Sequence, residues 1–173
     1  MNLDDLPPAK LMWEGKFVRA FKRGNWEYAS RARDIDAVVI LAEHEGKLIL
    51  VSQPRVPPDC HCVELPAGLV GDHDPNATIE DTAIKELEEE TGFTAERVER
   101  LGDFYSSPGM LAEAFTLVRA HGVRKVGEGG GDDSEDIEVH LVARADVPNF
   151  LEQKRAEGFG IDAKLLLLLG PLA

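Results

Sequence analysis

Residues 64–93, with the sequence ELPAGLVGDHDPNATIEDTAIKELEEETGF, decide the fold of this chain. They predict a short strand, a loop rich in glycine and aspartate, and then a helix over roughly residues 78–91. Thr78, with Asp81 three positions later, is typical of a capping box that starts a helix. Gly92 suits the left-handed position that ends one. The core-facing stripe of this helix is predicted to be Ala83, Ile84, Leu87 and Thr91.

Three glutamates gather on one face of the predicted helix. Glu86, Glu89 and Glu90 are three and four positions apart, and residues at that spacing share a face. Like charges this close repel each other and cost stability. Carboxylate oxygens suit Mg²⁺, which binds proteins through a few carboxylates, several waters and substrate phosphates. The sequence therefore predicts half of a diphosphate site, completed by a metal ion.

The composition bounds the class of protein. A chain of 173 residues with 43% hydrophobic residues is long enough to bury a sizeable core as one domain. Its net charge of −13 argues against binding to nucleic acid or to a membrane through a basic surface. The amino terminus has no signal-peptide pattern, and the apolar run at residues 165–169 is too short to span a bilayer. We therefore expect a cytoplasmic protein.

The remaining pattern predicts strands with few helices. Residues 16–33 predict a hairpin that turns at Arg23-Gly24-Asn25 and needs a partner surface to be stable. Cys60 and Cys62 lack the second pair of ligands that structural zinc requires, so they are expected to pack within a strand. Further strands are predicted at 37–42, 47–53, 62–65, 98–104, 114–120 and 137–143, further helices at 148–157 and 162–169, and a mobile acidic loop at 127–136. This order predicts an α+β fold with a mixed sheet between helices.

Residues 68–93 resemble the Nudix box of the Nudix hydrolases. That box runs Gly, five residues, Glu, seven residues, then Arg-Glu-hydrophobic-x-Glu-Glu-x-Gly-hydrophobic. The segment KELEEETGF at residues 85–93 matches its second half. The first half departs, because Ala77 replaces the first Glu, Lys85 replaces Arg, and residues 72–76 carry about three extra residues. Lysine keeps the charge of arginine and loses its forked contact, which alters the support of the site rather than its metal ligands.

The resemblance covers most of the chain and is closest to the ADP-ribose pyrophosphatase branch. It rests on Gln53-Pro54-Arg55, Glu64-Leu65-Pro66-Ala67-Gly68-Leu69, Ser107-Pro108-Gly109 and Trp26-Glu27. It implies a Nudix-like α/β/α sandwich with a mixed β-sheet between helices. It also implies an N-terminal β-hairpin subdomain over residues 1–34, used for dimerisation and base binding, and a Nudix hydrolase domain over residues 35–173. Members of this branch are homodimers whose hairpin crosses to the partner.

The resemblance implies metal-binding and catalytic residues. The cofactor would be Mg²⁺, with Mn²⁺ as an alternative, and its ligands would be Glu86, Glu89, Glu90 and the main-chain carbonyl of Ala67. Glu135, just before a predicted strand, would act as general base or orient the attacking water. Glu89 is the second residue expected to take part in catalysis. The number of metal ions is left open.

Substrate contacts are implied in the same way. Trp26 would stack on the base and Glu27 would hydrogen-bond to it, while Arg55 would grip a phosphate. Glu113 is expected to bind substrate and is the rival of Glu135 for the role of base. Trp26 equally suits packing at a dimer interface, and the sequence leaves open whether it serves its own subunit or the partner.

The implied reaction is hydrolysis of the diphosphate of a nucleoside diphosphate sugar. ADP-ribose, cut to AMP and ribose 5-phosphate, is the favoured substrate, with GDP-mannose or another sugar nucleotide as the alternative. A non-catalytic sensor of ADP-ribose is the alternative from another class. Ala77 and Lys85 favour the sensor, whereas the three retained glutamates favour the enzyme.

Overall fold

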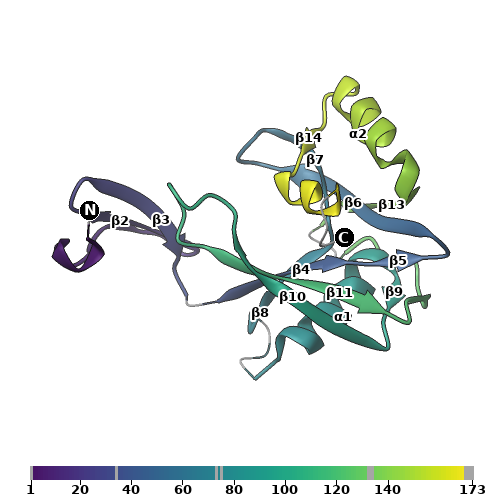
Figure 1. Cartoon of the computed structure of the whole chain (residues 1–173), viewed down its shortest axis with the longest axis horizontal. Helices are drawn as coiled ribbons and strands as arrows, with labels where there is room; N and C mark the ends of the chain where they lie inside the picture. Colours follow the sequence, from purple (N-terminus) through teal and green to yellow (C-terminus); the bar gives the residue numbers. More distant parts are fainter. Residues whose placement is uncertain (1, 34, 73, 75, 132–134, 170–173) are drawn as a thin grey trace.

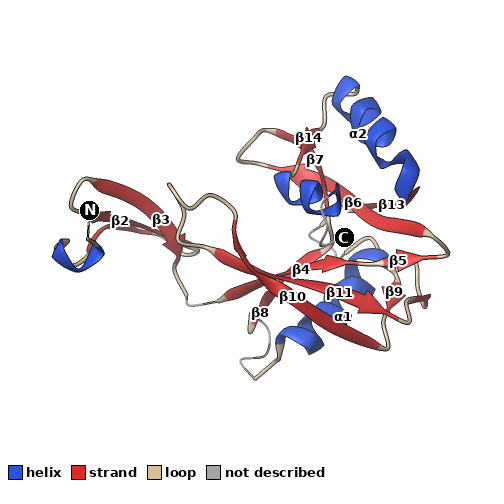
Figure 2. Cartoon of the chain, viewed as in Figure 1, coloured by secondary structure: helices blue, strands red, loops and turns tan. Residues whose placement is uncertain are grey.

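The computed structural model describes residues 2–33, 35–72, 74, 76–131 and 135–169 of the chain. Two mixed β-sheets form its centre, and a separate three-stranded sheet extends from them at the N-terminal end (Figure 1, Figure 2). The α-helices of the described part are α1, Ile79–Thr91, and α2, Val147–Ala156. None of the described helices is both long and apolar enough to cross a bilayer.

The two central sheets each contain one parallel pair of strands. The first has the order β10-β11-β4-β8, with bounds Arg97–Tyr105, Ala114–His121, Asp36–Leu41 and Ala67–Val70, and β11 runs parallel to β4. The second has the order β13-β6-β7-β14, with bounds Glu138–Ala143, Lys47–Arg55, Cys60–Glu64 and Gly160–Ile161, and β14 runs parallel to β7. The short elements are β5 (Glu43–His44), β9 (Phe93–Thr94), β12 (Arg124–Lys125), η1 (Leu3–Asp5), η2 (Arg144–Asp146) and η3 (Ala163–Leu169).

Strand β4 supplies alternate residues to two hydrophobic clusters, as the two-residue period of a strand requires. One cluster joins β4 and β11 to α1 and includes Val38, Ile40, Ala83, Leu87 and Val118. The other joins both sheets to α2 and η3 and includes Val39, Leu41, Leu50, Val63, Leu151 and Leu165. The helices therefore cover opposite faces, which confirms the predicted α+β sandwich, although the single predicted sheet is divided in two.

Helix α1 begins and ends as the sequence predicts. Thr78 is the N-cap and accepts a 3.1 Å hydrogen bond from the backbone N–H of Asp81. The carboxylate of Asp81 in turn accepts from the Thr78 hydroxyl at 2.7 Å, so the reciprocal contact is made to a side chain rather than to the backbone. Gly92 has a φ of 73° and ends the helix. A Cβ at Gly92 would also collide with the backbone of Gly127, so two independent constraints require glycine there.

The N-terminal sheet contains the predicted hairpin and one strand that was not predicted. Its order is β1 (Lys10–Glu14), β2 (Val18–Arg23) and β3 (Trp26–Arg31), with Arg23 paired to Trp26 across the turn. Two backbone hydrogen bonds of 2.9 Å, from the N–H of Ala29 to the carbonyl of Met110 and from the N–H of Ala112 to the carbonyl of Ala29, attach β3 to the β10–β11 connection. The predicted domain boundary at residue 34 lies outside the described residues.

Three predictions about local structure need correction. The predicted loop after Pro66 begins as strand β8, because Ala67 and Leu69 pair with β4. The predicted helix at 162–169 is the 3₁₀ segment η3. Strand β6 continues through Pro54, which is tolerated because the pairing of β13 ends at Ser52 and only β7 flanks the proline. In the lengthened loop at 72–76, residues 73 and 75 lie outside the described part of the chain.

Candidate active site

A cleft of about 730 Å³ is bounded by α1, by β8 and by the ends of β6 and β7. This volume lies within the usual range of ligand sites. Its described lining is rich in carboxylates, namely Glu64, Asp72, Glu86, Glu89, Glu90, Glu113 and Glu135. The cations among the described lining residues are Arg31, Arg55, Lys85 and Lys164. A polar cleft of this composition suits an anionic ligand only if metal ions reverse the local field.

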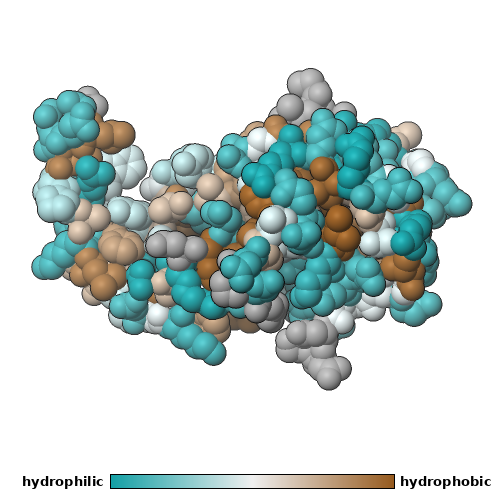
Figure 3. Space-filling model, turned by 90° about the horizontal axis from the view of Figure 1, so that it is seen from below, coloured by the Kyte–Doolittle hydropathy of each residue, from teal (hydrophilic) through white to brown (hydrophobic). Residues whose placement is uncertain are grey.

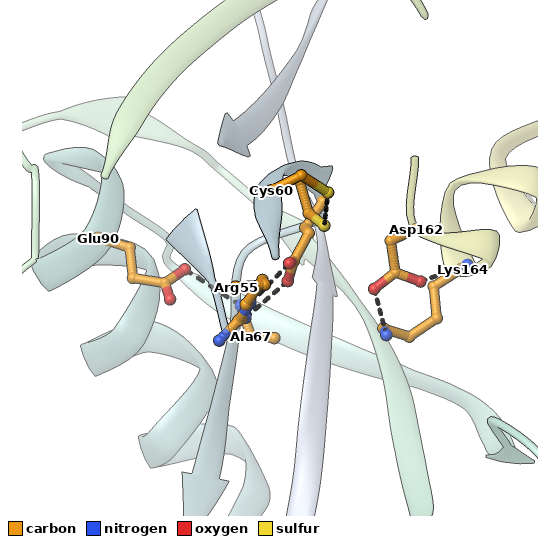
Figure 4. A network of polar contacts seen from close by, with 8 residues as sticks. Arg55, Cys60, Ala67, Glu90, Asp162 and Lys164 are labelled. Carbon is orange, nitrogen blue, oxygen red and sulfur yellow. Dashed lines mark hydrogen bonds and ion pairs between the residues drawn. The ribbon is translucent and has the colours of Figure 1, made fainter. Parts of the chain in front are cut away.

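The acidic face of α1 packs directly against β8. Gly68 approaches Glu86 so closely that a Cβ at this position would collide with the glutamate side chain. Glu90 is 4% exposed and accepts a hydrogen bond of 3.1 Å from the backbone N–H of Ala67 (Figure 4). The Pro-Ala-Gly segment therefore leaves room for Glu86 at Gly68 and donates a backbone hydrogen bond to Glu90 from Ala67.

Glu90 has the most strongly perturbed carboxyl group of the cleft. Burial raises its pKa to about 8, with smaller contributions in the same direction from the charges of Glu86 and Glu135. The hydrogen bond from Ala67 and the charge of Arg55 oppose this shift without cancelling it. In the metal-free protein burial therefore favours the protonated form of Glu90. A divalent cation would have to displace that proton, as metals do when they bind titratable ligands.

The donor set fits a hard divalent cation. Glu86 and Glu90 offer carboxyl oxygens, and a cation would favour the ionised form of Glu90 that burial and the charge of Glu86 disfavour. Glu89 makes a 2.9 Å ion pair with Lys85, and across the described residues no three His, Cys, Asp or Glu side chains converge tightly enough to cage an ion alone. Mg²⁺ needs no such cage, because it keeps several waters and takes ligands from substrate phosphates. The carbonyl of Ala67 remains a predicted ligand.

The arginines of the cleft are each held by a carboxylate. Arg55 donates from Nε and Nη2 to the two carboxylate oxygens of Glu64, both at 2.7 Å. These bonds raise the pKa of Arg55, and the charge of Glu90 raises it further. Arg31, at the end of β3, donates from Nε to Glu113 at 2.6 Å. The sequence predicted Arg55 and Glu113 as site residues but not Arg31 or Glu64.

Lys164 is a further lining residue that sequence reasoning missed. It lies on η3, forms an ion pair with Asp162, and holds its ammonium 5.9 Å from the centre of the Phe115 ring. Figure 4 shows this pair on the opposite side of Arg55 from Glu90. A lysine within a leucine-rich C-terminal segment carries no motif, so only the path of the chain brings it to the cleft.

Glu135 lines the cleft as predicted, and the end of the acidic loop nearest α1 is anchored. The N–H groups of Gly130 and Gly131 donate to the carbonyls of Glu90 and Glu89 at 2.8 and 3.0 Å, which satisfies acceptors at the C-terminal end of α1. A Cβ at Gly131 would collide with Glu135, so the side chain packs on that glycine. Residues 132–134 of the predicted loop lie outside the described part of the chain.

Trp26 and Glu27 do not line the cleft in the described part of this chain. Trp26 is 47% exposed on β3, and Glu27 pairs with Lys22 at 3.2 Å. The other predicted site residues do line it, namely Ala67, Glu86, Glu89, Glu90, Arg55, Glu113 and Glu135. One chain therefore brings to the cleft the residues predicted to contact metal and phosphate, and leaves outside it the residues predicted to contact the base.

The cleft therefore combines an acidic helix packed on a Pro-Ala-Gly strand, arginines beside it and a sandwich fold around it, which are the features of the predicted family. The chain belongs to the NUDIX domain family, whose sequence profile matches residues 32–164. The predicted family is thereby confirmed. Outside the box, the matched region includes Arg55 and Glu64 of the cleft.

Individual relatives agree with this assignment. The chain is 38% identical over 120 residues to a protein named ADP-ribose pyrophosphatase from Bacillus subtilis (strain 168), covering 68% of this chain but only 63% of that protein. It is 35% identical over 142 residues to a protein named GDP-mannose pyrophosphatase from Cronobacter sakazakii (strain ATCC BAA-894), covering 77% of this chain and 70% of that one. A solved structure described as an ADP compounds hydrolase matches with a TM-score of 0.66 at 21% identity, covering 85% of this chain and 82% of that one, which supports the fold.

Replacing Glu90 by Gln should stabilise the metal-free protein at alkaline pH. The folded pKa of about 8 lies above the reference value of 4.5, so the folded state holds a proton that the unfolded state releases as pH rises. Wild-type stability should therefore fall between about pH 4.5 and 8, and Glu90→Gln should remove this fall, a gain on the order of a few kcal/mol above pH 8. Urea unfolding in EDTA measures it.

The matched control is Glu88→Gln, which changes an exposed glutamate of the same helix. It should leave the pH dependence of stability unchanged. Addition of Mg²⁺ should reverse the order, since metal stabilises the state that binds it, and wild type should gain more than Glu90→Gln. Equal pH profiles for wild type and Glu90→Gln would contradict the proposed burial cost.

Proposed function

We propose that this protein is a Mg²⁺-dependent hydrolase of nucleoside diphosphate sugars, and that its favoured reaction converts ADP-ribose to AMP and ribose 5-phosphate. The observation that carries the proposal is that Glu86, Glu89 and Glu90 line the same cleft as Arg55 and Glu135. A diphosphate needs this combination of metal ligands, a forked donor and a nearby base. The names of the two sequence relatives support the substrate class. The cytoplasm remains the predicted compartment.

The proposed metal ligands are Glu86, Glu89, Glu90 and the carbonyl of Ala67. When bound, Mg²⁺, or Mn²⁺ as an alternative, supplies charge neutralisation at the diphosphate and lowers the pKa of a coordinated water. The chain contributes the rigid placement of these donors, because β8 fixes Glu90 through a hydrogen bond and makes room for Glu86. Arg55 binds a phosphate oxygen with donors that Glu64 does not use.

Glu135 is the proposed general base in preference to Glu113. The charge of Glu135 contributes to the raised pKa of Glu90. Glu135 therefore lies near the proposed metal ligands. Glu113 accepts a 2.6 Å hydrogen bond from Arg31. This contact commits the Glu113 carboxylate to an arginine that also lines the cleft. Glu113 is instead assigned to substrate binding, with Arg31.

The base of the nucleotide is proposed to bind in a homodimer, between the cleft of one subunit and Trp26 and Glu27 of the other. Large apolar side chains of the N-terminal sheet are exposed, among them Leu11, Met12, Trp13, Phe17 and Trp26. Figure 3 shows brown, hydrophobic patches on the lobe at its left, which lies apart from the main body. A small sheet with apolar residues on its surface needs a partner, and a second copy would also bring Trp26 to a cleft.

GDP-mannose is the second candidate substrate, favoured by the relative that carries its name. Trp26 would stack on guanine as readily as on adenine, because every base offers a π-face. The choice between the two substrates therefore depends on Glu27 and on the sugar end of the cleft. The non-catalytic sensor differs from both, since it would bind ADP-ribose without turnover.

Glu86→Gln should reduce hydrolysis by about a hundredfold or more while leaving the fold intact, because it removes a metal ligand from a half-exposed position. The measurement is nucleoside monophosphate release from ADP-ribose, GDP-mannose and ADP-glucose in Mg²⁺, with EDTA as the metal-free reference. Glu88→Gln, on the same helix and outside the cleft lining, is the matched control and should keep full activity. ADP-ribose binding without turnover by wild type would establish the sensor instead.

Glu135→Gln should lower kcat by on the order of a hundredfold or more with little change in KM, because glutamine keeps the shape and loses the base. Glu113→Gln should raise KM instead, since it releases Arg31 from its partner. Steady-state kinetics in saturating Mg²⁺ distinguish the two. A near wild-type kcat for Glu135→Gln together with a collapsed kcat for Glu113→Gln would reverse the assignment.

Trp13→Glu should convert the proposed dimer to a monomer, because it places a charge in the apolar surface of β1. Light scattering over a dilution series measures the mass. The monomer should have a KM for ADP-ribose about tenfold higher, through loss of the partner's stacking residue. Leu141→Glu, an exposed apolar position on β13 outside the N-terminal sheet, is the control and should stay dimeric. A monomeric wild type at every concentration would rule out the dimer.

A further inference from the structure

The side chain of Arg55 runs along the face of the second sheet to reach Glu64. In the β6–β7 register Arg55 is opposite Cys60, whereas Glu64 is opposite Val51. The two residues are therefore four positions apart along the strands, and both 2.7 Å bonds between them require the arginine side chain to run along the sheet face. Cys60, Cys62 and Glu64 share that face by the alternation of a strand. The guanidinium is thus drawn toward the acidic helix rather than out from the strand end.

The surroundings of this pair place it at the diphosphate site. Glu64 is 6% exposed, whereas the Arg55 side chain remains 44% exposed and lines the cleft. Figure 4 shows Arg55 beside Ala67, with Glu90 facing them from α1. Glu90 is close enough to Arg55 for the two groups to interact electrostatically. The guanidinium therefore lies between a buried anchor and the predicted metal ligands.

We propose that Glu64 is a positioning residue that holds Arg55 in the orientation needed to bind the substrate diphosphate. The inference rests on the proposed function and adds a residue to it. A guanidinium carries five N–H donors in a rigid plane, and Glu64 uses one on Nε and one on Nη2. Three donors remain, on Nη1 and Nη2, along the neighbouring edge of the plane. The fork with Glu64 fixes which way that edge faces.

Glu64 could affect the reaction by orienting Arg55 or by its own negative charge. The two roles predict opposite changes in kcat/KM when Glu64 is neutralised. A carboxylate beside a phosphate site repels an anionic substrate, so a residue that acted only through its charge would weaken binding, and its neutralisation would improve kcat/KM. A residue that orients Arg55 would do the reverse, and its loss would lower kcat/KM. The sign of the change therefore separates the two roles.

The experiment is a double-mutant cycle on ADP-ribose hydrolysis in Mg²⁺ with wild type, Glu64→Gln, Arg55→Ala and the double variant. Glu64→Gln should lower kcat/KM about tenfold or more, since small misplacements at a reacting centre are costly. The same substitution should have no further effect in the Arg55→Ala background, because Glu64 acts through Arg55. Glu64→Asp keeps the charge, shortens the side chain and should also lower kcat/KM.

The matched control is Glu80→Gln. Glu80 binds Arg100 through the same two-bond fork, at 2.7 and 3.0 Å, on the exposed side of α1 and outside the cleft lining. It should change kcat/KM by less than about twofold, as a surface pair contributes little. Unchanged or raised kcat/KM for Glu64→Gln, or an equal loss in both arginine backgrounds, would overturn the proposal.

Failure of the proposed function is distinguishable from failure of this inference. Wild type that hydrolyses no sugar nucleotide would refute the proposed function, and the cycle would then be read from the side-chain Nε–H signal of Arg55 in NMR spectra. A distinct, slowly exchanging signal in wild type and in Glu80→Gln, lost in Glu64→Gln, supports the anchoring. A signal that is equally mobile in wild type and Glu64→Gln overturns it. Thermal unfolding of each variant identifies any that fail to fold.

Discussion

The hydrogen bond from the backbone N–H of Ala67 to the buried carboxylate of Glu90 is the contact on which the site depends. It joins β8 to α1 across a long connecting loop and sets the height of the acidic face above the sheet. Gly68, next along β8, then leaves room for Glu86. A strand paired to β4 is rigid, so the glutamates are positioned by the core of the domain and not by the loop.

The buried position of Glu90 on the acidic face of α1 carries an electrostatic cost. Arg31, Arg55 and Lys85 each pair with a cleft carboxylate, and the charge of Arg55 offsets only part of the rise in the pKa of Glu90. The raised pKa of Glu90 expresses mainly the cost of burying its charge, with smaller contributions from the charges of Glu86 and Glu135. Strain of this kind persists only where surrounding structure enforces it, and here two hydrophobic clusters on either face of β4 provide that support. Metal binding would relieve the cost, which couples ligand affinity to the stability of the fold.

The sequence predicts elements that depend on contacts between near neighbours in the chain, and it misses those that depend on distant residues. Helix α1, its cap at Thr78 and its stop at Gly92 depend on contacts within four residues, and all were predicted. Strand β8 was predicted as a loop, because its conformation depends on pairing with residues some thirty positions earlier. The Arg55–Glu64 pair requires both the strand register and the reach of a long side chain, and neither can be read from spacing alone.

Arg31 shows the same limit and links the two parts of the chain. It lies on β3 of the N-terminal sheet yet lines the cleft of the central domain, where it holds Glu113. The N-terminal sheet is therefore attached to the site through a charged contact as well as through the backbone bonds of Ala29. In the proposed dimer one sheet would supply Arg31 to its own cleft and Trp26 to its partner's. Dimerisation would then serve stability and recognition together, because the association that covers the apolar surface also completes the base-binding half of each site.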